Sequence, residues 1–239
     1  MFELKGKYGK DCKVFMDELE QSALATIHSI LDDEVSANVP IRIMPDVHNG
    51  VDIVIGFTMP FTDRVNPNHI GVDIGCGVIC ARIPKMAMSL AEIDERIRAA
   101  VPMGFAHRAT TYPFDDPDVE RLAHKIGQDY AGVCRQVGTL GGGNHFIEIG
   151  ECDDEWYLFV HTGSRNFGLQ VCKYHAAKAN TNGSKYLFGA DMKEYFQDMT
   201  IAQWFASLNR STIVYEIMSS LDIHADYVCD TVHNYIDFN

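Results

Sequence analysis

The sequence predicts one mixed α+β domain over residues 1–239, with a β-sheet core flanked by helices. Three observations support this prediction. Apolar residues make up 46% of the chain, which is enough for a packed core. Segments with helical periodicity alternate with short Val- and Ile-rich runs that glycine interrupts, a pattern typical of strands with tight turns. The chain has no internal repeat or linker, and its length requires no second domain.

The elements of the first third follow from hydrophobic spacing. Apolar residues at helical spacing predict an amphipathic helix within residues 14–35. The apolar segment 41–44 predicts a strand that ends in a loop, and the segments 51–57 and 70–83 predict further strands. The tetrapeptide Ser89-Leu90-Ala91-Glu92 has the form of a capping box, so a helix is expected to begin there.

The remaining elements alternate in the same way. Residues 116–136 are predicted to be helical, and the glycines at 141–143 break the chain before a short strand at 146–149. Residues 156–160 predict a buried strand. From 191 to 230 the pattern predicts mostly helix, because no glycine or proline interrupts it.

The charge balance is acidic, with 20 basic residues against 33 acidic ones and a net charge of −13. This argues against a broad basic surface for nucleic acid, but it leaves open a local site in which bound cations neutralise phosphate. The apolar runs are too short to span a bilayer, and residues 1–13 lack the apolar core of a signal peptide. We therefore expect a cytoplasmic protein, away from membranes, whose seven cysteines form no disulfide framework.

The most informative segment is Gly71-Val72-Asp73-Ile74-Gly75-Cys76-Gly77. It places a carboxylate and a thiol three residues apart, in a backbone where glycine permits close approach to a ligand. Oxygen and sulfur ligands presented together suit manganese, iron or zinc better than magnesium or calcium. The alternative is a tight turn with a buried thiol, since free cysteine is commonly buried.

A second segment runs from Gly141 to Glu148. Its glycine-rich turn presents backbone N–H groups that can cradle phosphate. Along the strand that follows, Asn144 and Glu148 fall on one face and His145 on the other. His145 is therefore a candidate metal ligand, while Asn144 and Glu148 face a different ligand.

Two further segments supply candidate ligands. His161 lies at the end of the predicted buried strand, and Ser164 and Arg165 follow it, where they could hold a phosphate. His233 is another candidate, although a histidine in such a position is more often a surface or capping residue. One aspartate, one cysteine and three histidines would fill two neighbouring metal sites if the thiolate is shared, and paired metals serve phosphoryl chemistry.

Six segments together resemble, in order, the signature blocks of the RtcB family of RNA ligases. They are MPDVH (44–48), GVDIGCGV (71–78), GTLGGGNHFIEI (138–149), HTGSR (161–165), AQWFASLNR (202–210) and HNYIDF (233–238). The resemblance implies an RtcB-like fold and a GTP- and manganese-dependent ligase. Such an enzyme joins RNA ends bearing a 2′,3′-cyclic phosphate or 3′-phosphate to 5′-hydroxyl ends, through a histidine–GMP intermediate, in tRNA splicing or RNA repair.

The resemblance also implies two Mn²⁺ ions that share one ligand. Asp73, Cys76 and His145 would hold the first ion. Cys76, His161 and His233 would hold the second, with the Cys76 thiolate bridging the two.

By position in the same blocks, Asn144 would contact the nucleotide phosphates, Glu148 the guanine and Arg165 the RNA phosphate. In the family, the guanylated histidine lies in a His-Gly-Ala-Gly-Arg segment after the HNY block, and these 239 residues contain no such segment. The expectation is a ligase domain incomplete at its C-terminal end, which binds metal without completing ligation. An activating protein or a complementing C-terminal chain would then be a partner.

Other functions remain open. A metal-dependent phosphohydrolase or nuclease would use the same metals without guanylation, and would cleave RNA with manganese but without GTP. A non-catalytic relative would bind metal or RNA, or pair with a chain that carries the missing segment. The remaining possibility is an α+β domain with incidental histidines, and replacement of Cys76 by alanine separates it from the others, because metal is lost only if the site exists.

Overall fold

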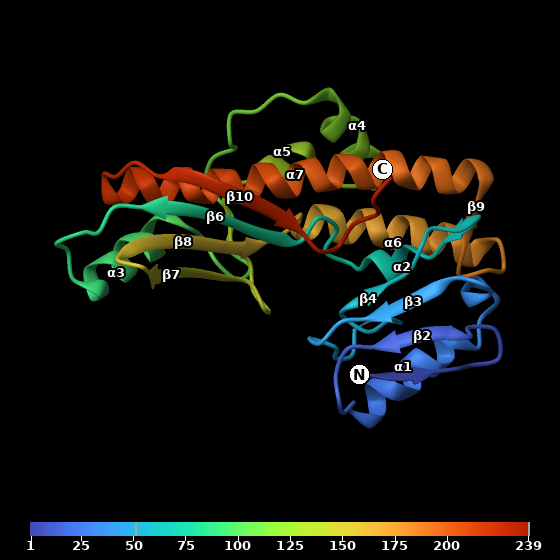
Figure 1. Cartoon of the computed structure of the whole chain (residues 1–239). Coiled ribbons are helices and arrows are strands. Elements are labelled where there is room, and N and C mark those ends of the chain that lie inside the picture. Colours follow the sequence, from blue (N-terminus) through green and yellow to red (C-terminus); the bar gives the residue numbers. More distant parts are fainter. Residues whose placement is uncertain (51, 239) are drawn as a thin grey trace. The chain divides into compact units, whose positions relative to one another are not determined.

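A computed structural model describes residues 1–50 and 52–238 as a mixture of helices and strands (Figure 1), which confirms the predicted α+β class. Two compact units are present. Unit 1 comprises Met1–Gly71 and His175–Tyr195, and unit 2 comprises Val72–Tyr174 and the chain from Phe196 onward. The assignment of residues 1–239 to one domain stays a prediction, and its last residue lies outside the described part.

Unit 1 contains a four-stranded sheet with the order β1-β2-β3-β4. Its strands are β1 (Phe2–Leu4), β2 (Asp11–Val14), β3 (Pro40–Ile43) and β4 (Phe57–Thr58). β2 and β3 are parallel, and the other neighbours are antiparallel. Helix α1 (Gln21–Leu31) covers the sheet, with Ile27 and Leu31 in the same core cluster as Ile41. The smaller elements are η1 (Glu34–Ser36), β5 (Arg64–Val65), α2 (Pro67–Ile70) and β9 (Leu187–Phe188).

Two predictions in unit 1 need correction. The predicted helix at 14–35 is shorter, because residues 11–14 form β2, and α1 begins only at Gln21. Within the predicted strand 51–57, Val51 lies outside the described residues and only Phe57 is part of a strand. The chain turns there instead, with Asp52 in the left-handed region at φ 61° and a single bridge between Asn49 and Val54.

Unit 2 contains an antiparallel sheet with the order β10-β6-β8-β7 (Figure 1). Its strands are β6 (Gly77–Ile83), β7 (Phe146–Cys152), β8 (Glu155–Thr162) and β10 (Asp226–Val232). Helices α3 (Leu90–Ala100) and α7 (Gly189–Leu221) close the core, with Ile93 and Ile213 in one cluster with Leu158. The other helices are α4 (Pro117–Lys125), α5 (Tyr130–Cys134) and α6 (Arg165–Thr181). The part of α6 from His175 onward and the part of α7 up to Tyr195 belong to unit 1.

The predicted helix start is confirmed, since the Ser89 hydroxyl caps α3 by accepting a hydrogen bond from the Glu92 N–H at 3.3 Å. The Glu92 carboxylate accepts from Arg96 at 2.9 Å. The predicted helix at 116–136 is broken into α4 and α5, with Gly127 in the left-handed region at φ 72°. The strand predicted at 70–83 begins only at Gly77.

Strand β10 lies inside the segment predicted as mostly helix. Helix α7 ends at Leu221, and Asp222 adopts φ 54°, which no helix can continue. Residues 226–232 then pair with β6, so tertiary pairing overrides the absence of glycine and proline. This strand carries the chain back to the β6 end, where the His233 N–H donates to the Cys76 carbonyl at 2.9 Å.

No helix among the described residues combines the length and the apolar character that crossing a bilayer demands.

His69 gives unit 1 a pH-dependent stability. Its ring contacts those of Phe57 and Tyr186, each at 6.2 Å between centroids. Burial lowers the pKa of His69 from 6.5 to about 4, and the Lys185 charge acts in the same direction. Because the folded pKa lies below the unfolded one, the stabilisation is complete above pH 6.5 and is lost as the pH falls towards 4.

We expect His69→Gln to reduce the loss of stability between pH 7 and pH 4 by about 2 to 3 kcal/mol. Denaturant unfolding followed by circular dichroism at several pH values measures it. His48→Gln, at an exposed position, is the control. An unchanged pH profile in His69→Gln would show that this ring does not control acid stability.

Candidate metal centre

The strands of unit 2 bring four separate loops to one edge of the sheet. Gly77, the first residue of β6, pairs with Thr162 at the end of β8 and with Val232 at the end of β10. Phe146, the first residue of β7, pairs with His161. Antiparallel pairing therefore places the starts of β6 and β7 beside the ends of β8 and β10.

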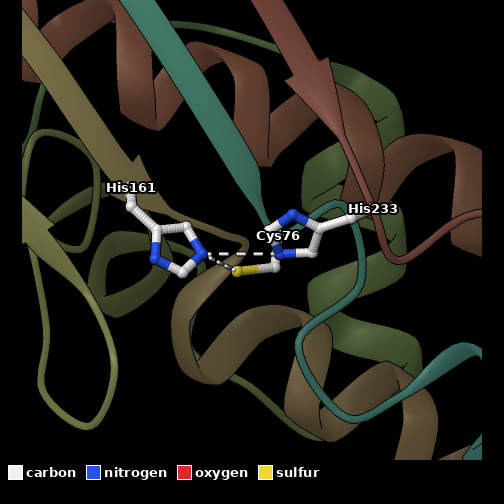
Figure 2. Close-up of side chains that lie close together, drawn as sticks. All are labelled: Cys76, His161 and His233. Carbon is white, nitrogen blue, oxygen red and sulfur yellow. Dashed lines mark hydrogen bonds between the residues drawn. The ribbon is translucent and has the colours of Figure 1, made fainter. Parts of the chain in front are cut away.

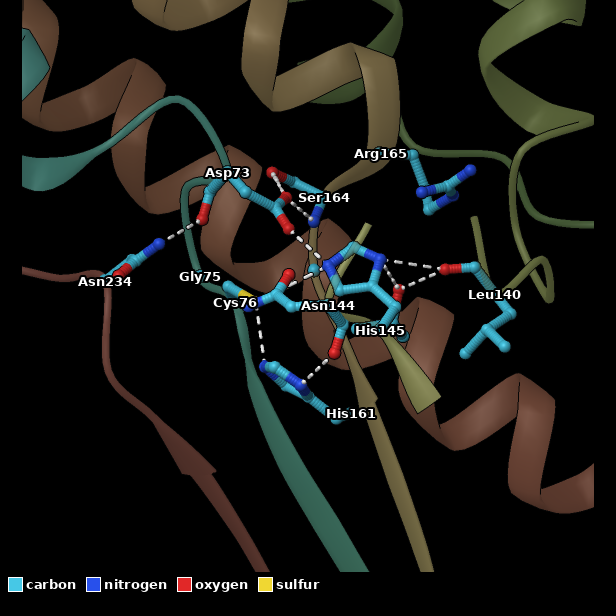
Figure 3. A network of polar contacts seen from close by, with 12 residues as sticks. Asp73, Gly75, Cys76, Leu140, Asn144, His145, His161, Ser164, Arg165 and Asn234 are labelled. Atoms are coloured by element: carbon cyan, nitrogen blue, oxygen red, sulfur yellow. Dashed lines mark hydrogen bonds and ion pairs between the residues drawn. The ribbon is translucent and has the colours of Figure 1, made fainter. Parts of the chain in front are cut away.

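All five residues predicted as metal ligands lie at this edge. Cys76, His161 and His233 form one group, in which the potential ligand atoms lie within 4.8 Å of one another (Figure 2). Asp73, Cys76 and His145 form a second group by the same measure (Figure 3). Cys76 belongs to both groups, as a bridging ligand would.

The thiol lies between the two groups of nitrogens. Cys76 Sγ is 3.3 Å from His161 Nε2 and 3.6 Å from His145 Nε2. His161 Nε2 is also 3.4 Å from His233 Nε2 (Figure 2). In the other group, His145 Nε2 is 2.9 Å from Asp73 Oδ2 (Figure 3).

Backbone carbonyls orient two of the rings. His145 Nδ1 lies 3.0 Å from the Leu140 carbonyl oxygen, and His161 Nδ1 lies 3.1 Å from that of Asn144. Because a carbonyl only accepts, each Nδ1 donates and each Nε2 presents a lone pair to Cys76. Metal-ligating histidines are commonly held in this way. The Nε2 lone pair of His145 also faces the Asp73 carboxylate. These two acceptors repel each other unless a proton or a cation lies between them, so the donor set fits a transition metal.

Electrostatics at the cluster follow from its burial. Burial raises the pKa of the Cys76 thiol, and the Asp73 charge raises it further. Burial lowers the pKa of His161, helped by the neighbouring His233 and His145. For Asp73, burial is the largest influence and acts to raise the pKa, but His145 and, to a lesser degree, Cys76 and Arg165 together outweigh it and the pKa is lowered. A bound cation would deprotonate the thiol, since thiolate is the ligating form.

Asn209, in the middle of α7, ties together two of the ligand-bearing loops. Its Oδ1 accepts from the Gly138 and Thr139 N–H groups at 2.8 and 3.1 Å. Its Nδ2 donates to the carbonyls of Thr139 and Gly163, both at 3.1 Å. All four bonds are buried, so the amide fixes the loop before β7 against the loop after β8.

Arg210, the next residue, secures the third loop. It is completely buried, and its Nη1 donates to the carbonyls of Gly75 and Thr162 at 2.7 and 3.0 Å. Its Nε and Nη2 pair with the Asp230 carboxylate on β10 at 2.6 and 3.0 Å. Neither Asn209 nor Arg210 was among the predicted site residues, although both end the block 202–210. An Asn-Arg pair in a long apolar helix segment was the available signal.

Ser164 differs from its predicted role as a phosphate contact. It is fully buried, and its N–H and Oγ both point to Asp73 Oδ1, at 2.9 and 3.3 Å (Figure 3). Asn234 Nδ2 donates to the Asp73 main-chain carbonyl at 3.0 Å. A Cβ at Gly163 would overlap the Asp73 carboxylate. These neighbours hold Asp73 in place.

Arg165 lies beside the cluster at the start of α6. Its φ of 58° is uncommon for a residue with a side chain and typical of functional sites. Nε donates to Thr139 Oγ1 at 3.1 Å and Nη2 to the Gly104 carbonyl at 3.3 Å. The guanidinium packs on Gly141, where a Cβ would overlap it.

Asn144 and Glu148 are both exposed, and so is Phe146 between them. His145 and Ile147 are less exposed, in agreement with the predicted alternation along this strand. The Phe146 ring lies 5.1 Å from that of His161. Asn144, in the turn before edge strand β7, and Glu148, within that strand, therefore both face solvent next to the cluster.

Comparison with known proteins identifies one family. Residues 34–132 and 126–239 match the family described as tRNA-splicing ligase RtcB. The chain is 31% identical over 217 residues to RNA-splicing ligase RtcB of Escherichia coli K12, covering 76% of this chain and 53% of that protein. It is 24% identical over 267 residues to tRNA-splicing ligase RtcB of Methanococcus maripaludis, covering 80% of this chain and 56% of the relative. The chain thus spans about half the length of these curated relatives.

Proposed function

The chain belongs to the RtcB family, and we propose that it forms the metal-binding part of an RNA ligase. The reaction would join RNA ends that carry a 2′,3′-cyclic phosphate or 3′-phosphate to 5′-hydroxyl ends, in tRNA splicing or RNA repair. It would depend on manganese and GTP and pass through a histidine–GMP intermediate. An activating protein, or a chain that supplies the guanylated histidine, would be its partner.

The observation that carries this proposal is the sharing of Cys76 between two ligand groups. A thiolate common to Asp73 and His145 on one side, and to His161 and His233 on the other, would place two cations next to each other. Carboxylate, imidazole and thiolate ligands together suit manganese better than magnesium. Two such ions would neutralise charge on phosphate oxygens as the RNA ends are joined.

The remaining residues would bind the two substrates. The exposed start of β7 and the turn before it suit the nucleotide, with Asn144 at its phosphates and Glu148 at the guanine. Arg165 suits the RNA phosphate, because a held guanidinium presents parallel donors to phosphate oxygens. The nucleotide and the RNA would therefore approach the metals from different sides of His145.

A ligation assay tests the proposal. Two RNA oligonucleotides, one with a 3′-phosphate and one with a 5′-hydroxyl, are incubated with the chain, Mn²⁺ and GTP. A second polypeptide that supplies the family's His-Gly-Ala-Gly-Arg segment is added or omitted. We expect joined RNA only when all components are present. Cleaved RNA that requires manganese but not GTP would instead make the protein a nuclease.

A polypeptide of these 239 residues alone should not form the histidine–GMP adduct, because it contains no His-Gly-Ala-Gly-Arg segment. Intact mass spectrometry after incubation with Mn²⁺ and GTP measures this, and the expected mass is unchanged. A gain of one GMP would place the nucleophile among the histidines of this chain and overturn the expectation.

A further inference from the structure

A cavity of about 810 Å³ adjoins the metal-ligand cluster within unit 2. Asp73, His145 and Arg165 contribute to its wall, and so do Phe105 and Arg135. Its size lies in the range of pockets that enclose small organic ligands. Asn144 and Glu148, the residues proposed for the nucleotide, are not part of this wall, so the cavity is available for the other substrate.

Phe105 is the unusual residue of this wall. Its side chain is fully exposed, at 101% of the reference value, yet its backbone is fixed. The neighbouring Gly104 N–H donates to the Gly141 carbonyl at 2.8 Å, and the Leu140 N–H donates to the Pro102 carbonyl at 2.9 Å. An exposed aromatic ring on a hydrogen-bonded loop, in the same wall as two arginines, offers a surface on which unpaired bases can stack.

Two helix ends carry the cationic groups of the wall. Arg135 follows the end of α5, and Arg165 is the first residue of α6. Arg165 is held by Thr139 and Gly104, as described above. The carboxylate nearest to Arg135, that of Asp129, lies 3.6 Å away, a distance too long for a hydrogen bond. Arg135 therefore keeps donors for a phosphate. The wall also contains the carboxylates of Asp73 and Asp129. Asp73 is one of the metal ligands, so with cations bound beside it the two guanidinium groups would give the wall a local positive charge in a chain of net charge −13.

We propose that this cavity binds the last nucleotides of the RNA strand that bears the 3′-phosphate. Arg165 would hold the terminal phosphate next to the metals, Arg135 the preceding phosphodiester, and Phe105 would stack on a base. The 3′-phosphate strand is favoured over the 5′-hydroxyl strand because only the former ends in a dianion that matches Arg165. Stacking reads no base edge, so binding should tolerate any terminal base. This inference rests on the proposed function.

The test is RNA binding by the manganese-loaded chain. The probe is a short single-stranded RNA with 2-aminopurine near a 3′-phosphate, whose fluorescence falls when the base stacks. We expect Phe105→Ala to weaken binding on the order of 10-fold and to abolish the quenching, and Phe105→Trp to retain both. Tyr227→Ala removes an exposed aromatic outside the cavity and should change nothing. Arg135→Gln should weaken binding and lower its salt dependence by about one phosphate contact.

The outcomes separate this inference from the function on which it rests. If the unaltered chain binds the 3′-phosphate RNA and Phe105→Ala binds and quenches equally well, the cavity assignment is wrong while the ligase proposal stands. If a 5′-hydroxyl RNA competes better than a 3′-phosphate RNA, the cavity holds the other strand. If no RNA binds in the presence of Mn²⁺, both proposals fail.

Discussion

Replacing Cys76 with alanine is expected to abolish binding of both manganese ions at once. The Cys76 thiol is the one ligand that both groups share, with Sγ 3.3 Å from His161 Nε2 and 3.6 Å from His145 Nε2. Removing a ligand of one group alone, as in His233→Ala, should leave one ion bound. Since loss of groups that merely orient a ligand costs 10- to 100-fold in metal affinity, we expect Cys76→Ala to cost more than about 100-fold.

Isothermal titration of the apoprotein with Mn²⁺ gives the number of ions and their affinities. The expected numbers are two for the unaltered chain, one for His233→Ala and none for Cys76→Ala. Cys134→Ala is the matched control, because Cys134 is also a buried free thiol but lies outside both groups. Two ions bound by Cys76→Ala would show that the cysteine is only a packing residue.

Replacing Arg210 with methionine is expected to destabilise unit 2 by about 3–5 kcal/mol, because it leaves the largely buried Asp230 carboxylate without its charged partner. The Ser207 hydroxyl, which donates to the same carboxylate at 2.7 Å, would remain. The replacement also removes the donors to the Gly75 and Thr162 carbonyls. We therefore expect weaker Mn²⁺ binding even where the chain is folded.

Denaturant unfolding with and without Mn²⁺ separates the two effects. Arg96→Met is the control, since Arg96 forms an exposed pair with Glu92 and such pairs contribute less than about 1 kcal/mol. The double variant Arg210→Met/Asp230→Leu removes both charges and should recover much of the stability but not the metal affinity. Recovery of full metal affinity in the double variant would show that Arg210 acts only through the ion pair.

The candidate ligands were predictable from the sequence, because each stands in a glycine-rich or strand-end segment whose chemistry is local. Their convergence was implied by the family resemblance but could not be derived from the predicted elements, since it depends on β10, and a segment free of glycine and proline concealed that strand within an apparent helix. Ser164 shows a similar limit: a hydroxyl beside an arginine suits a phosphate, but only the fold shows that Asp73 occupies it. Asn209 and Arg210 act through backbone carbonyls and amides, which leave no trace in the sequence of the loops that they hold.

The position of His233 also sets an order of events during synthesis. Cys76 and His161 are 85 residues apart, and a further 72 separate His161 from His233. Asp73, Cys76 and His145 have therefore all been synthesised on the order of ten seconds before the second group is complete. The second group needs His233, which directly follows β10, an edge strand whose single neighbour in the sheet is β6. Until β10 has been synthesised, Cys76 and His161 therefore lack the third residue of their group.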